Sequence, residues 1–399
     1  MDETALSRPL LLDGATGTRL QALGMPEGVC TPAWVLDHPD EFIAVQRGYV
    51  QAGSRVLTAP TFGADPESLK GYGLGDCAED FNRRLVELTR QAAGGKALIA
   101  GNLAPCGLGE FGVREGRFED VVDNYKVQAR ALRDADVDFY LVETMVDMAE
   151  ARAAVLAIRE VDEERPVVVS FCCDEEGRTP SGVDVLAGLI VMQGMQVDAF
   201  GLNCAPADWM LEQLERLAPY ASIPLLAQPN GGDWPEDWTA RCAKLGVRLF
   251  GGCCGTTEGD IRRMAADLEE LDVPDFRGAE RDPDVIPCAS EREARFITPD
   301  VDVSDPIPCT SDLVEDILEV EKNTPVGAIM IEIMEEDDVH IFAEHQYAVE
   351  DALCFWCDVP ELLEKALRVY QGRAFYDGTC GMDAADLRHL VEKYGLIML

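Results

Sequence analysis

The chain of 399 residues carries 74 acidic and 34 basic side chains, and its formal net charge of −40 disfavours a nucleic-acid partner because it repels phosphate backbones. No apolar run reaches the roughly 18 to 20 residues of a membrane span, and no charged-then-apolar leader opens the chain, so we expect no membrane contact. The 14 cysteines lack the spacing of a compact disulfide framework, which predicts reduced thiols and a cytoplasmic location.

Eight short apolar, β-branched runs recur before residue 271, and amphipathic segments with helical periodicity, such as 79–93 and 148–161, separate them. We predict strands at residues 10–13, 55–58, 97–101, 138–143, 167–172, 198–203, 224–228 and 248–251. Near-continuous apolar strands that alternate with helices indicate a parallel sheet. Eight such units match the size of a (β/α)8 TIM barrel, with a doubly wound open sheet as the alternative.

Chemically active side chains follow the ends of several predicted strands. They are Asp13, Asn102, Glu143, Asn203 with Cys204, Asn230, and Cys253 with Cys254. In a barrel the carboxyl ends of the strands form one rim, where the active sites of this fold lie. The positions of these residues therefore favour the barrel.

Residues 272–312 differ from the rest because six prolines stand among many acids without sustained periodicity, and we predict a linker. The barrel would span 1–271, and a smaller α/β domain would span 313–399. For this domain we predict helices at 313–321, 360–370 and 384–394, and strands at 326–333, 353–356, 374–377 and 396–399. It is too short to close a second barrel, so we expect an open layer that serves docking or homodimer formation, with its last apolar run buried.

Three thiols occur in Leu-Asn-Cys (202–204) and Gly-Gly-Cys-Cys-Gly-Thr-Thr (251–257), after predicted strands six and eight. Zinc favours thiolate sulfur, and a catalytic zinc keeps three protein ligands and one open position. We predict that Cys204, Cys253 and Cys254 bind Zn²⁺, the alternative being ordinary buried cysteines. A thiol bound at the open position would lose its proton and become a nucleophile.

Five motifs together carry a family resemblance. They are Leu-Asp-Gly-Ala-Thr-Gly-Thr (12–18), Leu-Val-Glu-Thr (141–144), Leu-Asn-Cys (202–204), Gln-Pro-Asn-Gly (228–231) and Gly-Gly-Cys-Cys-Gly-Thr-Thr (251–257). Through them, residues 9–270 resemble the zinc-dependent homocysteine S-methyltransferases, a family that includes the N-terminal module of cobalamin-dependent methionine synthase and betaine–homocysteine methyltransferase. The resemblance implies an enzyme that activates homocysteine as a zinc thiolate and methylates it to methionine.

The resemblance also implies roles for individual residues. Cys204, Cys253 and Cys254 would hold the zinc, and Glu143 and Asp13 would receive the amino group of homocysteine. The remaining implied substrate contacts are the backbone amides of the loop with Gly14, Ala15 and Thr16, which would bind the carboxylate, together with Asn203 and Asn230. Asn230 would fill the open zinc position before the thiol arrives.

The methyl donor is predicted from departures within the family. Cys30 and Thr144 stand where the betaine-using branch has tryptophan and tyrosine, so an aromatic cage for a quaternary ammonium is incomplete. Thr144 resembles the cobalamin-dependent branch, which implies methylcobalamin on a separate corrinoid protein, because this chain lacks the Asp-x-His-x-x-Gly loop that ligates cobalt.

Three alternatives stay open. In the first, the methyl donor is a small sulfonium or methylammonium compound. In the second, the methyl acceptor is another thiol, since Ala59 and Pro60 replace the usual Thr-Asn of the family. The third alternative is a non-catalytic zinc-bound partner subunit. Residues 362–399 resemble part of a pterin-binding methyltransferase barrel, but the family's asparagine-serine pattern is absent, so no folate binding is inferred.

Overall fold

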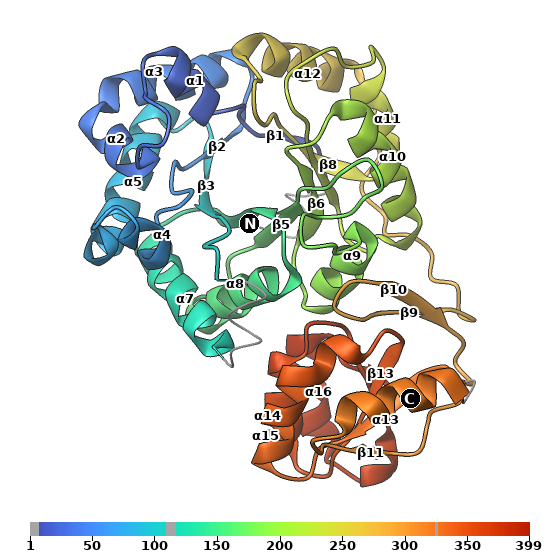
Figure 1. The fold of residues 1–399 in the computed structure, drawn as a ribbon. Helices are drawn as coiled ribbons and strands as arrows, with labels where there is room; N and C mark the ends of the chain where they lie inside the picture. The colour runs from blue at the N-terminus through green and yellow to red at the C-terminus, as the bar shows by residue number, and fades with distance from the viewer. Residues whose placement is uncertain (1–7, 109–116, 324–325) are drawn as a thin grey trace.

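The computed structural model describes residues 8–108, 117–323 and 326–399, and its largest sheet has eight parallel strands. They are β1 (Leu10–Leu11), β2 (Val56–Thr58), β3 (Leu98–Leu103), β4 (Phe139–Met145), β5 (Val167–Phe171), β6 (Ala199–Asn203), β7 (Leu225–Gln228) and β8 (Val247–Phe250). Their order is β1-β8-β7-β6-β5-β4-β3-β2. The N–H of Arg55, just before β2, donates to the carbonyl of Leu11 at 2.7 Å and links the two ends of the sheet. The strands form the ring seen in Figure 1, and the predicted (β/α)8 barrel is confirmed.

Helices surround this ring, and at least one follows each strand (Figure 1). They are α1 (Gly17–Ala22), α2 (Thr31–Asp37), α3 (Pro39–Ala52), α4 (Pro66–Lys70), α5 (Ala78–Ala93), α7 (Phe118–Asp134), α8 (Met148–Val161), α9 (Val185–Gly194), α10 (Ala207–Leu217), α11 (Trp238–Lys244) and α12 (Glu258–Glu270). In the part of the chain that the structure describes, no helix combines the length and apolar character needed to cross a membrane.

Strand side chains fill the centre of the ring. The buried cluster there consists of Leu12, Val56, Ala100, Phe139, Leu141, Val168, Ala199, Leu226 and Leu249. Intervening residues such as Tyr140 and Val169 belong instead to a larger cluster that includes the surrounding helices. Because the interior is packed, ligand chemistry is confined to the loops at the ends of the strands.

A second parallel sheet follows the barrel, and its strands lie side by side in chain order. They are β11 (Ile307–Pro308), β12 (Ala328–Glu332), β13 (Ala352–Trp356), β14 (Phe375–Tyr376) and β15 (Ile397–Met398), connected through α13 (Leu313–Asn323), α14 (Glu336–His345), α15 (Pro360–Val369) and α16 (Ala384–Tyr394). Ile329 and Phe355 pack in the cluster that contains the helices, whereas Met330 and Cys354 belong to a separate cluster on the other face.

A hairpin covers the face of the second sheet that lacks helices. It consists of β9 (Ile286–Ala289) and β10 (Ala294–Ile297), and Cys288 packs against Met330 and Cys354. The N–H of Arg373 donates to the carbonyl of Ala289 at 2.8 Å. The hairpin lies between α9 and the second sheet (Figure 1). Residues 272–312, which we expected to be a linker, thus contain this hairpin and the first strand of the second sheet.

The second unit differs from the sequence-based prediction at two further places. Helix α14 was not predicted from the sequence, because acids fill its first turn and only Val339 and Phe342 are buried in it. The C-terminal run 396–399 is buried only at Leu396, whereas Met398 and Leu399 are 41% and 43% exposed. The run forms the edge strand β15, so part of it faces away from the core.

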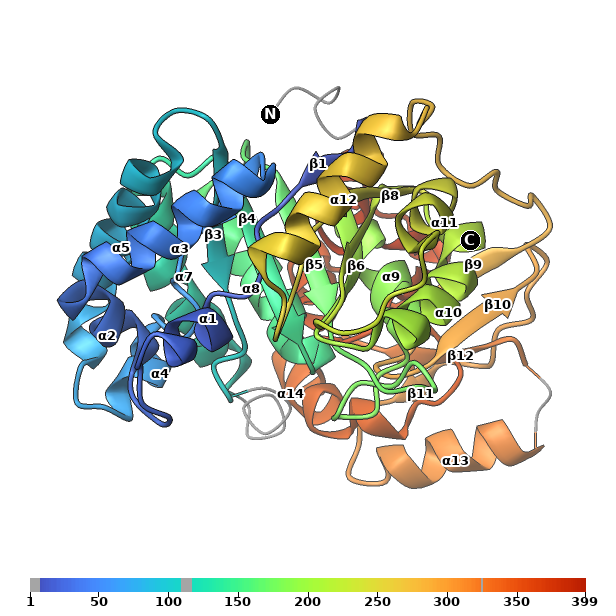
Figure 2. The same ribbon diagram turned by 90° about the horizontal axis from the view of Figure 1, so that it is seen from above.

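The second unit packs against α8 and α9, as Figures 1 and 2 both show. Every residue from 148 to 158 in α8 is buried. The guanidinium of Arg152 donates to the carbonyls of Leu367 at 2.8 Å and Arg368 at 3.1 Å, at the end of α15. These are carbonyls that a helix leaves without internal partners. Arg368 in turn forms ion pairs with Glu119 and Glu160 of the barrel.

Candidate functional site

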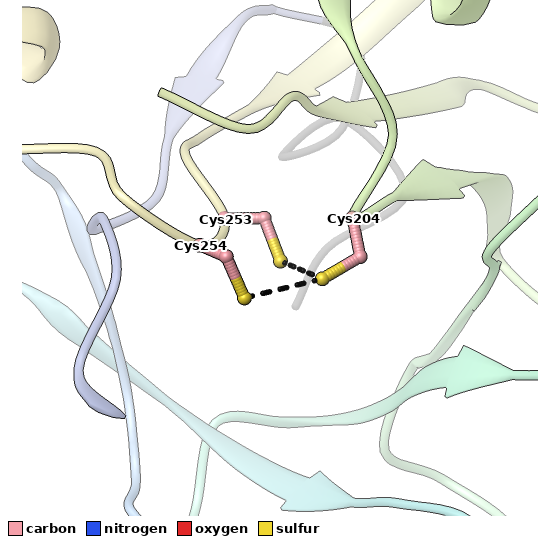
Figure 3. A group of neighbouring side chains, drawn as sticks. All are labelled: Cys204, Cys253 and Cys254. Atoms are coloured by element: carbon pink, nitrogen blue, oxygen red, sulfur yellow. Dashed lines mark hydrogen bonds between the residues drawn. The ribbon is translucent and has the colours of Figure 1, made fainter. Parts of the chain in front are cut away.

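Three cysteine side chains converge at the carboxyl ends of β6 and β8. The Sγ of Cys204 lies 2.8 Å from the Sγ of Cys253 and 3.4 Å from the Sγ of Cys254 (Figure 3). All three sulfurs lie within 4.8 Å of one another. Within residues 8–108, 117–323 and 326–399, this is the one group of three or more His, Cys, Asp or Glu side chains close enough to hold a metal ion.

Backbone geometry aims these side chains at one point. Cys204 has a positive φ of 58°, a left-handed conformation that is uncommon outside glycine and often found at functional sites. Its N–H donates to the carbonyl of Gln228 at 3.2 Å, and the N–H of Cys253 donates to the carbonyl of Pro229 at 2.8 Å. A Cβ at Gly252 would lie 2.4 Å from Thr256 Oγ1, so only glycine fits directly before the cysteine pair. The loops after β6, β7 and β8 are therefore tied together around the sulfurs.

The three thiols form one electrostatic unit. Hydrogen bonds from Cys204 and Cys253 hold the pKa of the Cys254 thiol well below its ordinary value, whereas the hydrogen bond between Cys253 and Cys204 raises the pKa of Cys253. Among the three sulfurs, Cys254 is thus the one whose charged form the neighbouring thiols favour most. Such a site attracts a soft cation that replaces the shared protons.

This donor set fits zinc. Zn²⁺ takes thiolate sulfur at about 2.3 Å in tetrahedral geometry, which separates the sulfurs by roughly 3.8 Å. The observed separations of 2.8 and 3.4 Å lie within about 1 Å of that value, so a small outward rotation of the side chains suffices. Among the described residues no fourth Cys, His, Asp or Glu joins the cluster, which leaves one position for another ligand.

A pocket of about 290 Å³ opens beside the cysteines. Its walls come from residues 13–18 after β1, Thr31, the end of β2 with the loop that follows it (residues 58–60 and Phe62), and the ends of β3, β4 and β7. Gly252 and the three cysteines complete the wall. The residues that line it from β3, β4 and β7 are Asn102, Glu143, Thr144 and Gln228. The predicted residues Asp13 and Glu143 therefore share one cavity with the cysteines.

Of the two carboxyl groups in the pocket wall, Asp13 is buried and Glu143 is half-buried. Asp13 accepts hydrogen bonds from the Thr58 N–H at 3.0 Å, the Thr58 hydroxyl at 2.8 Å and Gln46 Nε2 at 3.4 Å. Glu143 accepts one from Asn102 Nδ2 at 3.0 Å. Burial raises the pKa of Asp13 and the pKa of Glu143 to about 7 each, against the hydrogen bonds that favour the charged forms.

Two residues of the pocket wall each carry a side-chain oxygen without a hydrogen-bond donor. The side-chain oxygens of Asn102 and Gln228 are buried and have no hydrogen-bond partner. No Lys, Arg or His is among the described residues that line the cavity. A ligand group that donates several hydrogen bonds and carries positive charge, such as a primary ammonium, would satisfy both the free acceptors and the carboxylates.

The other residues predicted as substrate contacts either have part of their hydrogen-bonding capacity already in use or lie outside the pocket wall. Gly14, Ala15 and Thr16 line the pocket, but the Ala15 N–H already donates to Thr256 Oγ1 at 2.9 Å. Asn203 does not line the cavity, and its side chain bonds to Thr144 and Cys253 instead.

Asn230 also lies outside the residues that line the cavity. Its carbonyl accepts a hydrogen bond from Trp234 Nε1 at 2.7 Å, and its buried Oδ1 has no partner. A role of Asn230 at the metal therefore stays a prediction.

Sequence reasoning did not single out Thr58, Phe62, Asn102, Thr144 and Gln228 as pocket contacts. A signal existed for Thr144 and Gln228, since both stand inside the quoted motifs, and Asn102 was placed on the rim. Thr58 and Phe62 flank Ala59 and Pro60, which marked this loop as part of the rim, but nothing in the spacing shows which side chains of the loop line the pocket.

Comparison with known proteins gives consistent similarity. The family profile described as homocysteine S-methyltransferase matches residues 10–268. The chain is 31% identical over 300 residues to methionine synthase of Mycobacterium leprae (strain TN), which covers 66% of this chain and 24% of that protein. It is 30% identical over 304 residues to methionine synthase of Mycobacterium tuberculosis (strain ATCC 25618 / H37Rv), which covers 67% and 25%. The chain thus spans about a quarter of the length of these relatives.

A solved structure shows the same resemblance. The metallated form of the homocysteine methyltransferase MmuM from Escherichia coli superposes with a TM-score of 0.56 at 28% sequence identity, covering 65% of this chain and 96% of that one. The family profile spans the barrel strands, the three cysteines and the residues that line their pocket.

Proposed function

The chain belongs to the homocysteine S-methyltransferase family, and from that premise we propose that it methylates the thiol of homocysteine to give methionine. The observation that carries the proposal is the cluster of three cysteine sulfurs at the wall of a pocket that also holds Glu143. The sulfurs suit a metal that binds a thiol, and the carboxylates suit the amino group at the other end of the same small molecule.

Cys204, Cys253 and Cys254 would hold one zinc ion. When bound, zinc supplies a Lewis acid that lowers the pKa of a coordinated thiol, so that the substrate sulfur is a nucleophile at neutral pH. The protein's own part is to fix the position of that sulfur. Three ligands from two rim loops tied by backbone hydrogen bonds provide this fixed geometry.

Asp13 and Glu143 would bind the homocysteine ammonium. A cation beside these carboxylates favours their charged forms and offsets the burial that raises their pKa values to about 7. The partner-free oxygens of Asn102 and Gln228 would accept further N–H groups. The loop 14–18 would hold the substrate carboxylate through backbone amides other than that of Ala15.

The methyl donor would approach from the open side of the pocket, where Cys254 and Phe62 are exposed. We propose methylcobalamin carried by a separate corrinoid protein as this donor. The substrate sulfur would attack the methyl carbon and form the S–C bond while the carbon–cobalt bond breaks with its electron pair left on cobalt. We rank a small methylated sulfonium or ammonium compound second as the donor. Phe62 is the only aromatic side chain among the described residues that line the pocket, which is too few to form an aromatic cage around such a cation.

Zinc K-edge absorption of the purified protein, first alone and then with homocysteine, tests the proposal. We expect three sulfur ligands that become four when homocysteine is added. If zinc keeps three sulfur ligands after homocysteine is added, the methyl acceptor would have to be another thiol. Pro60, which stands in the pocket wall in place of the usual asparagine, would be consistent with a different acceptor. A protein that binds no zinc at these cysteines would overturn the proposed function.

A further inference from the structure

The side chain of Asn203 lies behind the cysteine cluster and uses its full hydrogen-bonding capacity. Its Oδ1 accepts from the Thr144 N–H and from the Ser170 hydroxyl, both at 3.1 Å. Its Nδ2 donates to Thr144 Oγ1 at 2.7 Å and lies 3.8 Å from Cys253 Sγ, within reach of a hydrogen bond to the larger sulfur atom. A primary amide has two donor hydrogens and two acceptor lone pairs, so all four are engaged.

This arrangement fixes which end of the amide faces the sulfur. The Thr144 N–H can only donate, so the atom it meets must be the amide oxygen. The NH₂ group is thereby directed toward Thr144 Oγ1 and Cys253 Sγ. Asn203 is itself 1% exposed, so no solvent competes for these bonds. The donor is therefore preorganised toward the cysteine.

The backbone on both sides is held in an unusual conformation. Thr144 and Cys204 both have positive φ values, 62° and 58°, and Cys204 directly follows Asn203 in the chain. The ends of β4 and β6, which flank β5 in the sheet, thus both carry strained backbone that persists only where the surroundings hold it. The Asn203 side chain bonds to both the backbone and the hydroxyl of Thr144, which links the end of β4 to the end of β6.

We propose that Asn203 is a positioning residue that donates a hydrogen bond to the thiolate of Cys253 when a metal is bound, and so reduces the negative charge that this sulfur places on the metal. The inference rests on the proposed metal-binding function. Three thiolates give a divalent ion a net charge of −1, and a fixed N–H beside one sulfur offsets part of that charge. Groups bonded to metal ligands tune the metal in this way. Asn203, which the sequence suggested as a substrate contact, acts instead through Cys253.

Cobalt-substituted protein provides the test, because Co²⁺ bound to thiolates gives a sulfur-to-metal charge-transfer band whose energy reports the charge on sulfur. Asn203→Asp keeps an oxygen for the Thr144 N–H and removes the NH₂ donor, and Asn203→Leu removes the donor without adding charge. We expect both variants to shift the band to longer wavelength and to weaken Co²⁺ binding about 10- to 100-fold.

Ser170→Ala is the matched control, since it removes one bond to Oδ1 and leaves the donor in place. Its band should stay at the wild-type wavelength. Unshifted bands in both Asn203 variants would overturn the inference, and so would a shift in Asn203→Asp alone, which would reflect the added charge. Absence of the thiolate band in the wild-type protein would instead refute the metal site of the proposed function, and this inference with it.

Discussion

The main chain of Gly395 lies directly against the main chain of Gly194, so that a Cβ at Gly395 would come within 2.8 Å of the Gly194 carbonyl carbon. Gly194 ends α9 of the barrel, and Gly395 is the left-handed residue after α16, with φ at 72°. The carboxyl end of a barrel helix and the carboxyl end of a helix in the second unit thus meet main chain to main chain at this point. The guanidinium of Arg373 closes the contact by donating to the Gly395 carbonyl at 2.8 Å.

Replacing Gly395 with alanine should therefore destabilise the protein through both strain and collision. Gly381 separates the two effects, because its φ of 75° is nearly the same but a Cβ there would meet nothing within 4 Å. We expect Gly381→Ala to cost about 1 kcal/mol and Gly395→Ala about 1 to 3 kcal/mol more. Urea unfolding of the two variants gives the comparison, and equal losses would show that the contact with Gly194 relaxes without cost.

Loss of the Arg152 side chain should weaken the attachment of the second unit. Arg152→Ala would leave the carbonyls of Leu367 and Arg368 unpaired in a buried contact and would open a cavity. We expect a loss of about 2 to 4 kcal/mol in the free energy of unfolding. Arg241→Ala, which breaks an exposed ion pair with Glu215, is the control, and its cost should stay below about 1 kcal/mol. Similar losses in both variants would contradict this role for Arg152.

Truncation of the chain after Leu271 should leave an insoluble or aggregated barrel. The outer faces of α8 and α9 are apolar and buried under the second unit and the hairpin, so truncation would expose them as one continuous patch. Size-exclusion chromatography of residues 1–271 beside the full chain checks this. A monomeric, cooperatively folded fragment would show instead that the barrel is stable alone.

Cys253→Ser should abolish stoichiometric zinc binding, because a hydroxyl does not replace a thiolate as a ligand for zinc. Cys173→Ser is the control, since Cys173 also belongs to an adjacent cysteine pair at a strand end but lies outside the cluster. Zinc content after gel filtration gives the answer. A full equivalent of zinc in the Cys253 variant would refute the ligand assignment.

Glu143 should make the stability of the ligand-free protein fall as pH rises. Burial raises the pKa of Glu143 from 4.5 to about 7, so between these values the folded chain retains a proton that the unfolded chain releases. The stability contributed by that proton is complete below about pH 4.5, declines as pH rises, and is lost above about pH 7.

Glu143→Gln removes this dependence. At pH 8 the variant should be more stable than the wild type by on the order of 3 kcal/mol, and near pH 4.5 the difference should approach zero. Thermal unfolding of the metal-free proteins across this range measures it. Parallel curves for variant and wild type would show that burial does not perturb this carboxyl group.

Most of the barrel could be predicted from the sequence because its strands are buried on both faces. Each predicted strand overlaps an observed one, and helix 148–161 coincides with α8. The cysteine cluster was equally predictable, since all barrel strands end at the same rim and a residue after β6 must lie near residues after β8.

The features that escaped prediction depend on contacts between distant segments. Strands β9 and β10 have four residues each, and Pro287 and the charged turn between them resemble a linker. The hairpin is buried because its apolar side chains pack against the face of the second sheet that carries no helices. The positive φ values of Thr144 and Cys204 likewise leave no trace in the sequence, because both are ordinary side chains in a conformation set by Asn203 and the neighbouring loops.

The hairpin of β9 and β10 also explains how five parallel strands suffice in the second unit. Parallel strands in chain order carry all their connecting helices on one face, so the other face requires either further strands that close a ring or a separate cover. Here the covering segment is supplied by the residues that join the two sheets. The second sheet can therefore end at β15 without closing into a ring, because the hairpin already covers the face that would otherwise form the interior of a barrel. The molecule thus combines a barrel that carries a pocket at the carboxyl ends of its strands with an open sheet whose helix-free face is covered by the hairpin.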